Sequence, residues 1–105
     1  MPIKRTPAKP AHGHPELVGL LVDELRHDAV AGPPGSPLIC EEEQRFGGLH
    51  VTVIWDRWRE VPDKAERGAI ILDAYVEAGR VQDAKRIRLV LGLTEEEAKK
   101  LKIEY

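Results

Sequence analysis

Hydrophobic positions along the chain change their period several times, and each period predicts a helix or a strand. Four leucines recur at helical spacing behind Pro15, a residue that suits a first helical position. They are Leu17, Leu20, Leu21 and Leu25. This apolar stripe predicts a helix, and the Gly-Pro-Pro-Gly sequence of residues 32–35 ends it.

Two strands are predicted next. Residues 38–45 form the first, and their acidic run, 41–43, is typical of an edge strand that avoids pairing with other molecules. A Gly-Gly turn at residues 47–48 leads to residues 49–56, which alternate between apolar and mixed positions. Strict alternation indicates a strand that is buried on one side. The apolar side carries Leu49, Val51, Val53 and Trp55.

The period then returns to that of a helix. Asp63 and Glu66 have the spacing of a capping box, so a helix is expected to begin there, and Gly79 is expected to end it. Gly68 is unfavourable inside a helix and marks a candidate break that would divide the helix into two. Residues 80–85 are interpreted as a loop or a helical turn.

A third strand and a short helix complete the pattern. Residues 86–91 alternate, with Ile87, Leu89 and Leu91 on one side. Thr94 and Glu97 then form a second capping box, which predicts a short last helix.

These elements predict an α+β domain of αββααβ(α) order, with a three-stranded sheet and helices packed on one face. The rows that contain Val53 and Leu89 are expected to lie beneath the helices. The opposite face is expected to stay open to solvent or to a partner. It would carry His50, Thr52, Ile54, Asp56, Arg86, Arg88 and Val90.

The chain of 105 residues is expected to form one domain, residues 14–105, behind a flexible tail. Residues 1–13 contain three prolines and three basic residues without periodicity, so they cannot offset the entropy of ordering. We interpret them as a solvated basic, proline-rich tail, with a phosphate-binding arm as the alternative.

Composition narrows the function classes. The net charge is −2, from 16 basic and 18 acidic residues, so the surface as a whole does not attract a polyanion. Cys40 is the single cysteine, which excludes an intramolecular disulfide and favours a reducing compartment. No apolar run approaches the length of a membrane span, and the N-terminus lacks the apolar segment of a secretory signal. We therefore expect a cytoplasmic protein without a membrane partner.

Two segments resemble the BolA family, whose domains have a class II KH-like arrangement. Residues 50–58, His-Val-Thr-Val-Ile-Trp-Asp-Arg-Trp, are similar to that family's His-containing strand, which runs through valines to an aspartate, an arginine and an aromatic residue. Residues 87–97 are similar to its closing strand and the Thr-Pro-Glu-Glu start of its last helix. The resemblance implies a BolA-like fold from the first helix onward.

The family also implies a role beside a glutaredoxin, in which a helix histidine and a hairpin His or Cys hold an iron–sulfur cluster. Residues 66–68 stand where the family has its Arg-His-Arg motif, and they read Glu-Arg-Gly. An arginine cannot ligate iron because it stays protonated. An iron–sulfur or metal accessory protein is therefore our third hypothesis, and we expect no bound cofactor.

Metal-binding and catalytic residues are few. His12 and His14 form a His-x-His pair that His27, His50 or Cys40 would have to complete. We interpret the pair as solvated imidazoles of the tail. Cys40 is interpreted as a buried small side chain rather than a nucleophile, because the three glutamates that follow it oppose thiolate formation. No nucleophile–base pair is visible, so we expect a protein that is not an enzyme.

Our first hypothesis is an interaction domain that binds a protein partner, or a second copy of itself, through the open sheet face. Ile54 and Val90 would be its apolar centre, with Arg86 and Arg88 beside them. Trp58, between two arginines, resembles an interface anchor, with ordinary local packing as the alternative.

The second hypothesis is a KH-like nucleic-acid-binding protein. Five basic residues would form its positive patch on or beside the open face. They are Arg57, Arg59, Lys85, Arg86 and Arg88.

Overall fold

Four α-helices and a three-stranded sheet form the described part of the computed structural model, residues 13–26 and 35–103. The helices are α1 (Pro15–Arg26), α2 (Lys64–Glu77), α3 (Val81–Arg86) and α4 (Glu95–Lys100). The strands are β1 (Leu38–Glu43), β2 (Leu49–Ile54) and β3 (Ile87–Leu93), and two 3₁₀ turns, η1 (Arg45–Gly47) and η2 (Asp56–Glu60), flank β2. This order confirms the predicted α+β fold of αββααβ type. The predicted tail, apart from residue 13, lies outside the described residues.

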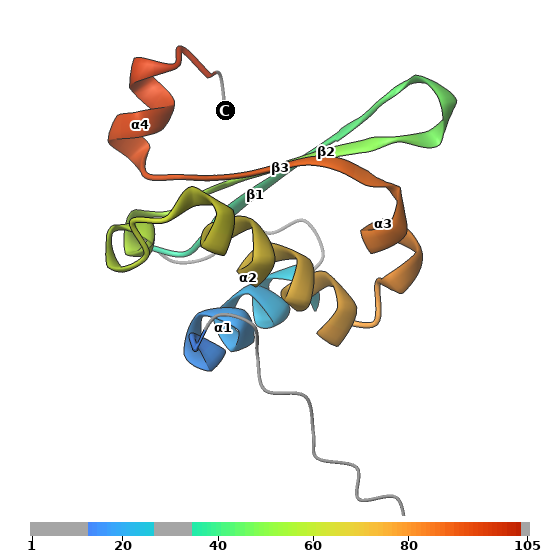
Figure 1. Ribbon diagram of the computed structural model, residues 1–105, viewed down its shortest axis with the longest axis horizontal. Helices are drawn as coiled ribbons and strands as arrows, with labels where there is room; N and C mark the ends of the chain where they lie inside the picture. The colour runs from blue at the N-terminus through green and yellow to red at the C-terminus, as the bar shows by residue number, and fades with distance from the viewer. Residues whose placement is uncertain (1–12, 27–34, 104–105) are drawn as a thin grey trace, which may run out of the picture.

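Strand β2 is the centre of the sheet. It pairs with β1 in the antiparallel direction and with β3 in the parallel direction, so the strand order is β1-β2-β3. The acidic β1 is an edge strand, as its sequence predicts. Helices α1 and α2 cover one face of the sheet, whereas α4 lies at one end of the other face (Figure 1). The expectation that all helices pack on one face is therefore wrong for α4.

The main core lies between β2 and the helices α1 and α2. Leu49, Val51 and Val53 are fully buried there, and Trp55 is 3 % exposed, as the alternation of β2 predicts. From the helices come Leu17, Val18, Leu21, Val22, Ile70, Ile71, Ala74 and Tyr75. Burial of these apolar surfaces provides most of the free energy that favours folding.

The pairing of β3 with β2 contains one extra residue. Leu49 lies opposite Ile87, but His50 lies opposite Leu89, so Arg88 has no partner of its own in the ladder. Successive side chains of a strand point to opposite faces, and one extra residue therefore exchanges the two faces for everything that follows it. The prediction for β3 is correct at Ile87 and wrong beyond Arg88.

This irregularity places Val90 and Gly92 beneath the helices, opposite Val51 and Val53. Val90 packs against the main core, where the sequence pattern predicted an open position. Leu89 and Leu91 lie on the other face, although the sequence pattern predicted that both would be buried beneath α1 and α2.

Both predicted N-cap residues begin their helices, but the full capping box forms at one of them. The Asp63 carboxylate accepts a hydrogen bond from the Ala65 N–H at 2.9 Å and so begins α2. The Glu66 carboxylate lies 3.3 Å from His14 (Oε1 to Nε2) and does not form the predicted capping box. Both hydrogen bonds of the Thr94–Glu97 capping box are present. Helix α2 runs through Gly68 without a break. The second helix of the predicted pair is α3, in the segment interpreted as a loop or helical turn.

Two glycines bring α2 and β3 close together. A Cβ atom at Gly68 would lie 3.1 Å from Cγ1 of Val90. At Gly92 it would lie 2.9 Å from Cβ of Arg67 and 3.0 Å from Cε2 of Trp58. Gly68 is therefore a contact position rather than a helix break.

We expect Gly92→Ala to lower the free energy of unfolding by about 2 kcal/mol, because the added methyl group has no space beside the Trp58 ring. Gly19→Ala in α1 is the matched control. Its Cβ meets nothing within 4 Å, so this change should raise stability by about 0.5–1 kcal/mol. Urea unfolding of both variants measures the difference, and equal effects would contradict the packing described for Gly92.

Candidate interaction surface

The sheet face opposite α1 and α2 carries three rows of side chains, one from each strand. Residues paired across strands point to the same face. The row nearest the β1–β2 hairpin holds Glu42, His50 and Leu89, and the middle row holds Cys40, Thr52 and Leu91. The third row holds Leu38, Ile54 and Leu93.

Helix α4 covers Ile54 and Leu93 of the third row but leaves Leu38 exposed. Ile54 is 4 % exposed and Leu93 is fully buried, because both pack against Ala98 of α4 and the partly buried Ile103. Ile54 is therefore not available as the apolar centre of an interface, which corrects the sequence-based expectation. We define the open face as the remaining side chains: Leu38, Cys40, Glu42, His50, Thr52, Leu89 and Leu91.

Large apolar side chains are exposed on the open face. Leu38 and Leu89 each expose 44 % of their surface, and Leu91 of the middle row is half-buried against Ile54, Leu93 and Ala98. At the hairpin end of the sheet, Phe46 of η1 is 95 % exposed and has a φ of 64°, in the left-handed region that bulky residues rarely adopt. A contiguous apolar patch is typical of an interaction surface, and Cys40 and Leu91 lie in the row between Leu38 and Leu89.

Two other residues predicted to bind a partner lie elsewhere. Val90 faces α2, as described above. Trp58 is fully buried, its Nε1–H donates to the Val53 carbonyl at 3.0 Å, and its ring packs edge-on against Trp55 with centroids 5.3 Å apart. The interface-anchor interpretation of Trp58 is therefore wrong, and the alternative of local packing is correct.

Arg86 is held by carboxylates at the edge of the sheet. Its guanidinium donates to both Glu43 oxygens, at 2.8 and 3.1 Å, and lies 3.3 Å from Asp83. These hydrogen bonds raise the pKa of Arg86. Because Glu43 pairs with Leu49 on the helix-covered side of the ladder, Arg86 is directed away from the open face.

A related cluster joins β1 to the helices. Glu41 accepts hydrogen bonds from the Tyr75 hydroxyl at 2.9 Å and from the Arg80 guanidinium at 2.7 Å. Arg80 also bonds Asp83 at 2.7 Å and lies over the Tyr75 ring. Burial, followed by the bond to Glu41, raises the pKa of Tyr75. The cluster fixes the edge strand β1 against α2 and α3.

The five basic residues of the nucleic-acid hypothesis do not form one patch. Arg57 and Arg59 lie in η2, beyond the end of β2, whereas residues 85–88 lie beside its start. Arg57 donates to Glu60 at 2.7 and 3.2 Å and to Glu16 at 3.2 Å. Arg88 lies against Gly48, where a Cβ would meet its side chain at 2.8 Å. Nucleic-acid binding stays a prediction, and the five residues named for it do not form a continuous basic surface.

The metal candidates are also dispersed. Within residues 13–26 and 35–103, no three His, Cys, Asp or Glu side chains gather as metal ligands would. His12 and His27 lie outside the described residues, and His14 pairs with Glu66. Cys40 and His50 share the open face in neighbouring rows. Burial raises the pKa of the Cys40 thiol, which opposes its conversion to a thiolate ligand.

Arg67 is a buried charge that the sequence did not single out for any role. It is 4 % exposed and donates to the carbonyls of Val61, Trp58 and Gly92 at 2.6, 2.9 and 3.0 Å. A further bond reaches Glu97 Oε1 at 2.8 Å. Arg67 thus joins η2, α2, β3 and α4. The one signal in the sequence was a cation near the N-terminus of a helix, where the helix dipole disfavours it.

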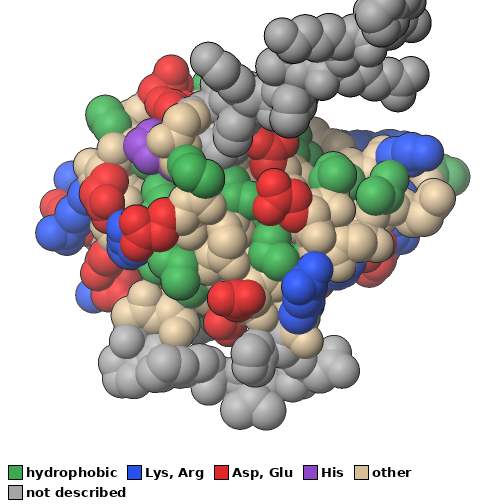
Figure 2. Space-filling model, turned by 90° about the horizontal axis from the view of Figure 1, so that it is seen from below, with side chains coloured by type: hydrophobic (Ala, Val, Ile, Leu, Met, Phe, Trp, Pro, Cys, Tyr) green, Lys and Arg blue, Asp and Glu red, His purple; other side chains and the backbone are tan. Residues whose placement is uncertain are grey.

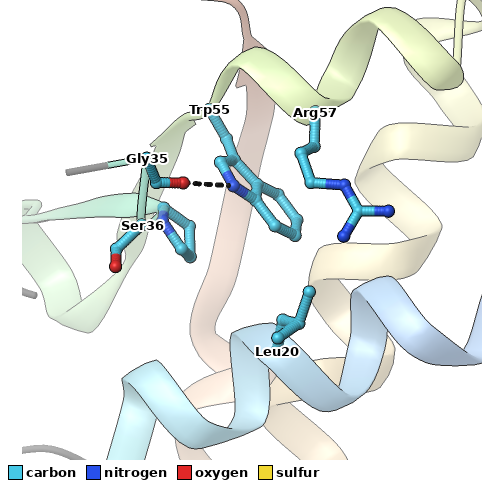
Figure 3. Close-up of a pocket in the computed structure, with 6 residues that line it drawn as sticks. Leu20, Gly35, Ser36, Trp55 and Arg57 are labelled. Atoms are coloured by element: carbon cyan, nitrogen blue, oxygen red, sulfur yellow. Dashed lines mark hydrogen bonds between the residues drawn. The ribbon is translucent and has the colours of Figure 1, made fainter. Parts of the chain in front are cut away.

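A shallow pocket of about 280 Å³ lies beside Trp55, between α1 and the start of β1 (Figure 3). Trp55 Nε1–H donates to the Gly35 carbonyl at 3.1 Å, and Arg57 lies 5.8 Å from the centre of the Trp55 ring. Leu20, Ser36 and Pro37 complete the lining. Its one charged lining residue, Arg57, already binds two carboxylates, so the lining offers a ligand little polar recognition.

The side of the molecule formed by α1 and α2 differs from the open face. Figure 2 shows hydrophobic side chains there scattered among acidic, basic and polar ones. Val76 of α2, for example, is 51 % exposed. Apolar side chains that are exposed singly are ordinary features of a protein surface.

No family model, curated protein or solved structure matches this chain. No helix within the described ranges has the length and apolar character needed to cross a membrane.

We expect the hydrogen bonds of Glu97 to make the free energy of unfolding depend on pH. The Thr94 backbone N–H and then Arg67 hold the pKa of Glu97 at about 2, below the value of about 4.3 in an unfolded chain. Because the pKa is lowered by folding, the stabilisation is complete above the unfolded value and is lost as the pH falls toward 2.

Glu97→Gln should therefore lower the melting temperature at pH 7, and the difference from the wild type should shrink below pH 4. Glu96→Gln is the control, since Glu96 is exposed and its described ion pair, with Lys100 at 3.5 Å, lies on the surface. Thermal unfolding monitored by circular dichroism between pH 2 and 7 measures both. A difference that persists unchanged at pH 2 would contradict this role of Glu97.

Proposed function

We propose that this protein is a small interaction domain that packs the open face of its sheet against another protein chain. The observation that carries the proposal is the exposure of Leu38 and Leu89 on the face that α1 and α2 leave uncovered. Catalysis is not part of the proposal.

The composition of the open face supports protein binding. Its middle row, Cys40, Thr52 and Leu91, carries no charge, and the charged Glu42 lies at its edge. Protein interfaces have this organisation, with an apolar centre depleted of charge and a polar rim.

The shape of the sheet also supports it. In Figure 1 the described helices leave the centre and the hairpin of the face that points away from α1 and α2 uncovered, with α4 at one end. A sheet face packs well against another sheet or a helix because its side chains stand in regular rows. The helix-covered side lacks such rows (Figure 2).

The BolA-like resemblance is compatible with an interaction role and stays a prediction. The residues we assign to the surface differ from those expected from the sequence. Leu38, Leu89 and Leu91 take the place of Ile54 and Val90, while Arg88 lies at the margin, against Gly48.

The proposal is tested by placing a charge on the open face. Leu38→Lys and Leu89→Lys should abolish binding to any partner that uses this face, because each buries a lysine in the contact. Partners are identified by pull-down and mass spectrometry, then purified and titrated by calorimetry against wild type and variants. Self-association of the chain, lost in the same variants, counts equally.

Val76→Lys is the matched control, because Val76 is exposed to a similar degree on the opposite side of the molecule. It should bind as the wild type does. All three variants should keep the circular dichroism spectrum of the wild type. If every purified partner binds the two leucine variants as tightly as the wild type, the open face is not the binding surface.

A further inference from the structure

We propose that the open face binds a second copy of this chain, packed face to face around a two-fold axis that crosses the strands near the middle row. The inference rests on the proposed function, since it names the occupant of the same surface. Three features of the described residues support it: the position of α4, its length and the distribution of charge.

Helix α4 makes the open face asymmetric. It rises from the end of β3 on the side away from α1 and α2, and so forms a wall that covers Ile54 and Leu93 (Figure 1). At the other end, where His50 and Leu89 lie, none of the described helices stands on this face. A flat partner could not contact the whole face without meeting this wall.

A second copy resolves this conflict. Rotation about an axis that crosses the strands brings the wall of each copy to the uncovered end of the other, so both ends of the gap between the sheets are closed. An axis parallel to the strands would bring both walls to the same end, where they would collide. A two-fold arrangement also makes every favourable contact twice.

The length of α4 matches the space between two packed sheets. The helix has 6 residues, which gives about 9 Å at 1.5 Å per residue. Sheets that pack face to face lie about 10 Å apart. The last turn of α4 would therefore reach the sheet of the second copy.

Charge and apolar character are complementary at that contact. The last turn of α4 carries Lys99 and Lys100, followed by Leu101, which is 58 % exposed. The end of the open face that it would meet carries Glu42 and the exposed Leu89. The arrangement thus places lysines beside a glutamate and a leucine beside a leucine.

The expected dimer is weak. The face comprises three short strands about 4.8 Å apart, and an interface of this extent falls below about 1,200 Å² in total, the range of transient complexes. We therefore expect the dissociation constant to be micromolar or higher.

Sedimentation equilibrium of the full chain at concentrations up to about 1 mM tests the inference. The wild type should show a monomer–dimer equilibrium. Leu89→Lys should weaken it by about ten-fold or more, because each symmetric dimer receives two buried lysines. Val76→Lys should leave it unchanged.

Chemical cross-linking tests the axis. Cys40 is the single cysteine, so a bis-maleimide reagent can only join Cys40 of one copy to Cys40 of another. The proposed axis places β1 over β1 at a Cα separation of about 10 Å, beyond the limit of about 7 Å for a disulfide. A short bis-maleimide should therefore yield cross-linked dimers at pH 8, whereas mild oxidation should yield few.

The outcomes separate this inference from the proposed function. A monomer at every concentration, together with a purified protein that loses binding to Leu89→Lys, overturns the second copy and keeps the interaction domain. A monomer without any partner that depends on Leu89 overturns both. A dimer that Leu89→Lys leaves intact, or one in which Cys40 does not cross-link, overturns the proposed packing.

Discussion

Strand β3 pairs with β2 in a register that contains one extra residue, Arg88, and this pairing determines the composition of both sheet faces. Beyond it, Val90 and Gly92 turn toward α2, while Leu89, Leu91 and Leu93 turn toward the other side. The small residue Gly92 leaves room for Trp58 and Arg67, and Leu93 packs against Ala98 of α4. A regular ladder would instead place Leu91 opposite Val53, against the Trp58 ring, and Gly92 opposite Ile54, where it would give α4 no apolar side chain to pack against. The irregular register is therefore a condition for packing on both sides of the sheet, and the exposed leucines of the open face are its consequence.

Much of the fold could be predicted from the sequence because local signals and burial agree there. The alternation of residues 49–55 identified the central strand and its buried side, and the caps at Asp63 and Thr94 identified two helix starts. The acidic β1 was recognised as an edge strand. These features depend on neighbours within a few residues, and such signals are visible in a single chain.

The candidate surface could not be predicted in the same way, because strand register is a property of two segments far apart in the sequence. Ile87, Leu89 and Leu91 alternate as a regular strand would, and nothing in that run marks Arg88 as an extra residue. The burial of Arg67 was equally hidden, since its acceptors come from the carbonyls of η2 and β3 and from Glu97. Backbone acceptors have no signature in the amino-acid sequence. Because of the irregular register, Leu89 rather than the predicted Val90 lies on the open face. Ile54, the other predicted apolar residue, is covered by α4.

The close approach of α2 to β3 has a consequence for how this fold can evolve. At Gly68 and Gly92 the backbone lies so close to neighbouring side chains that even a Cβ atom would be crowded. A substitution at either glycine adds a larger side chain, which would push the helix and the sheet apart. One or two substitutions there would therefore not create a ligand-binding cavity. New specificity is then most easily acquired from outside, by exchanging residues on the sheet's uncovered side, where a change of side chain leaves the packing of the two layers untouched.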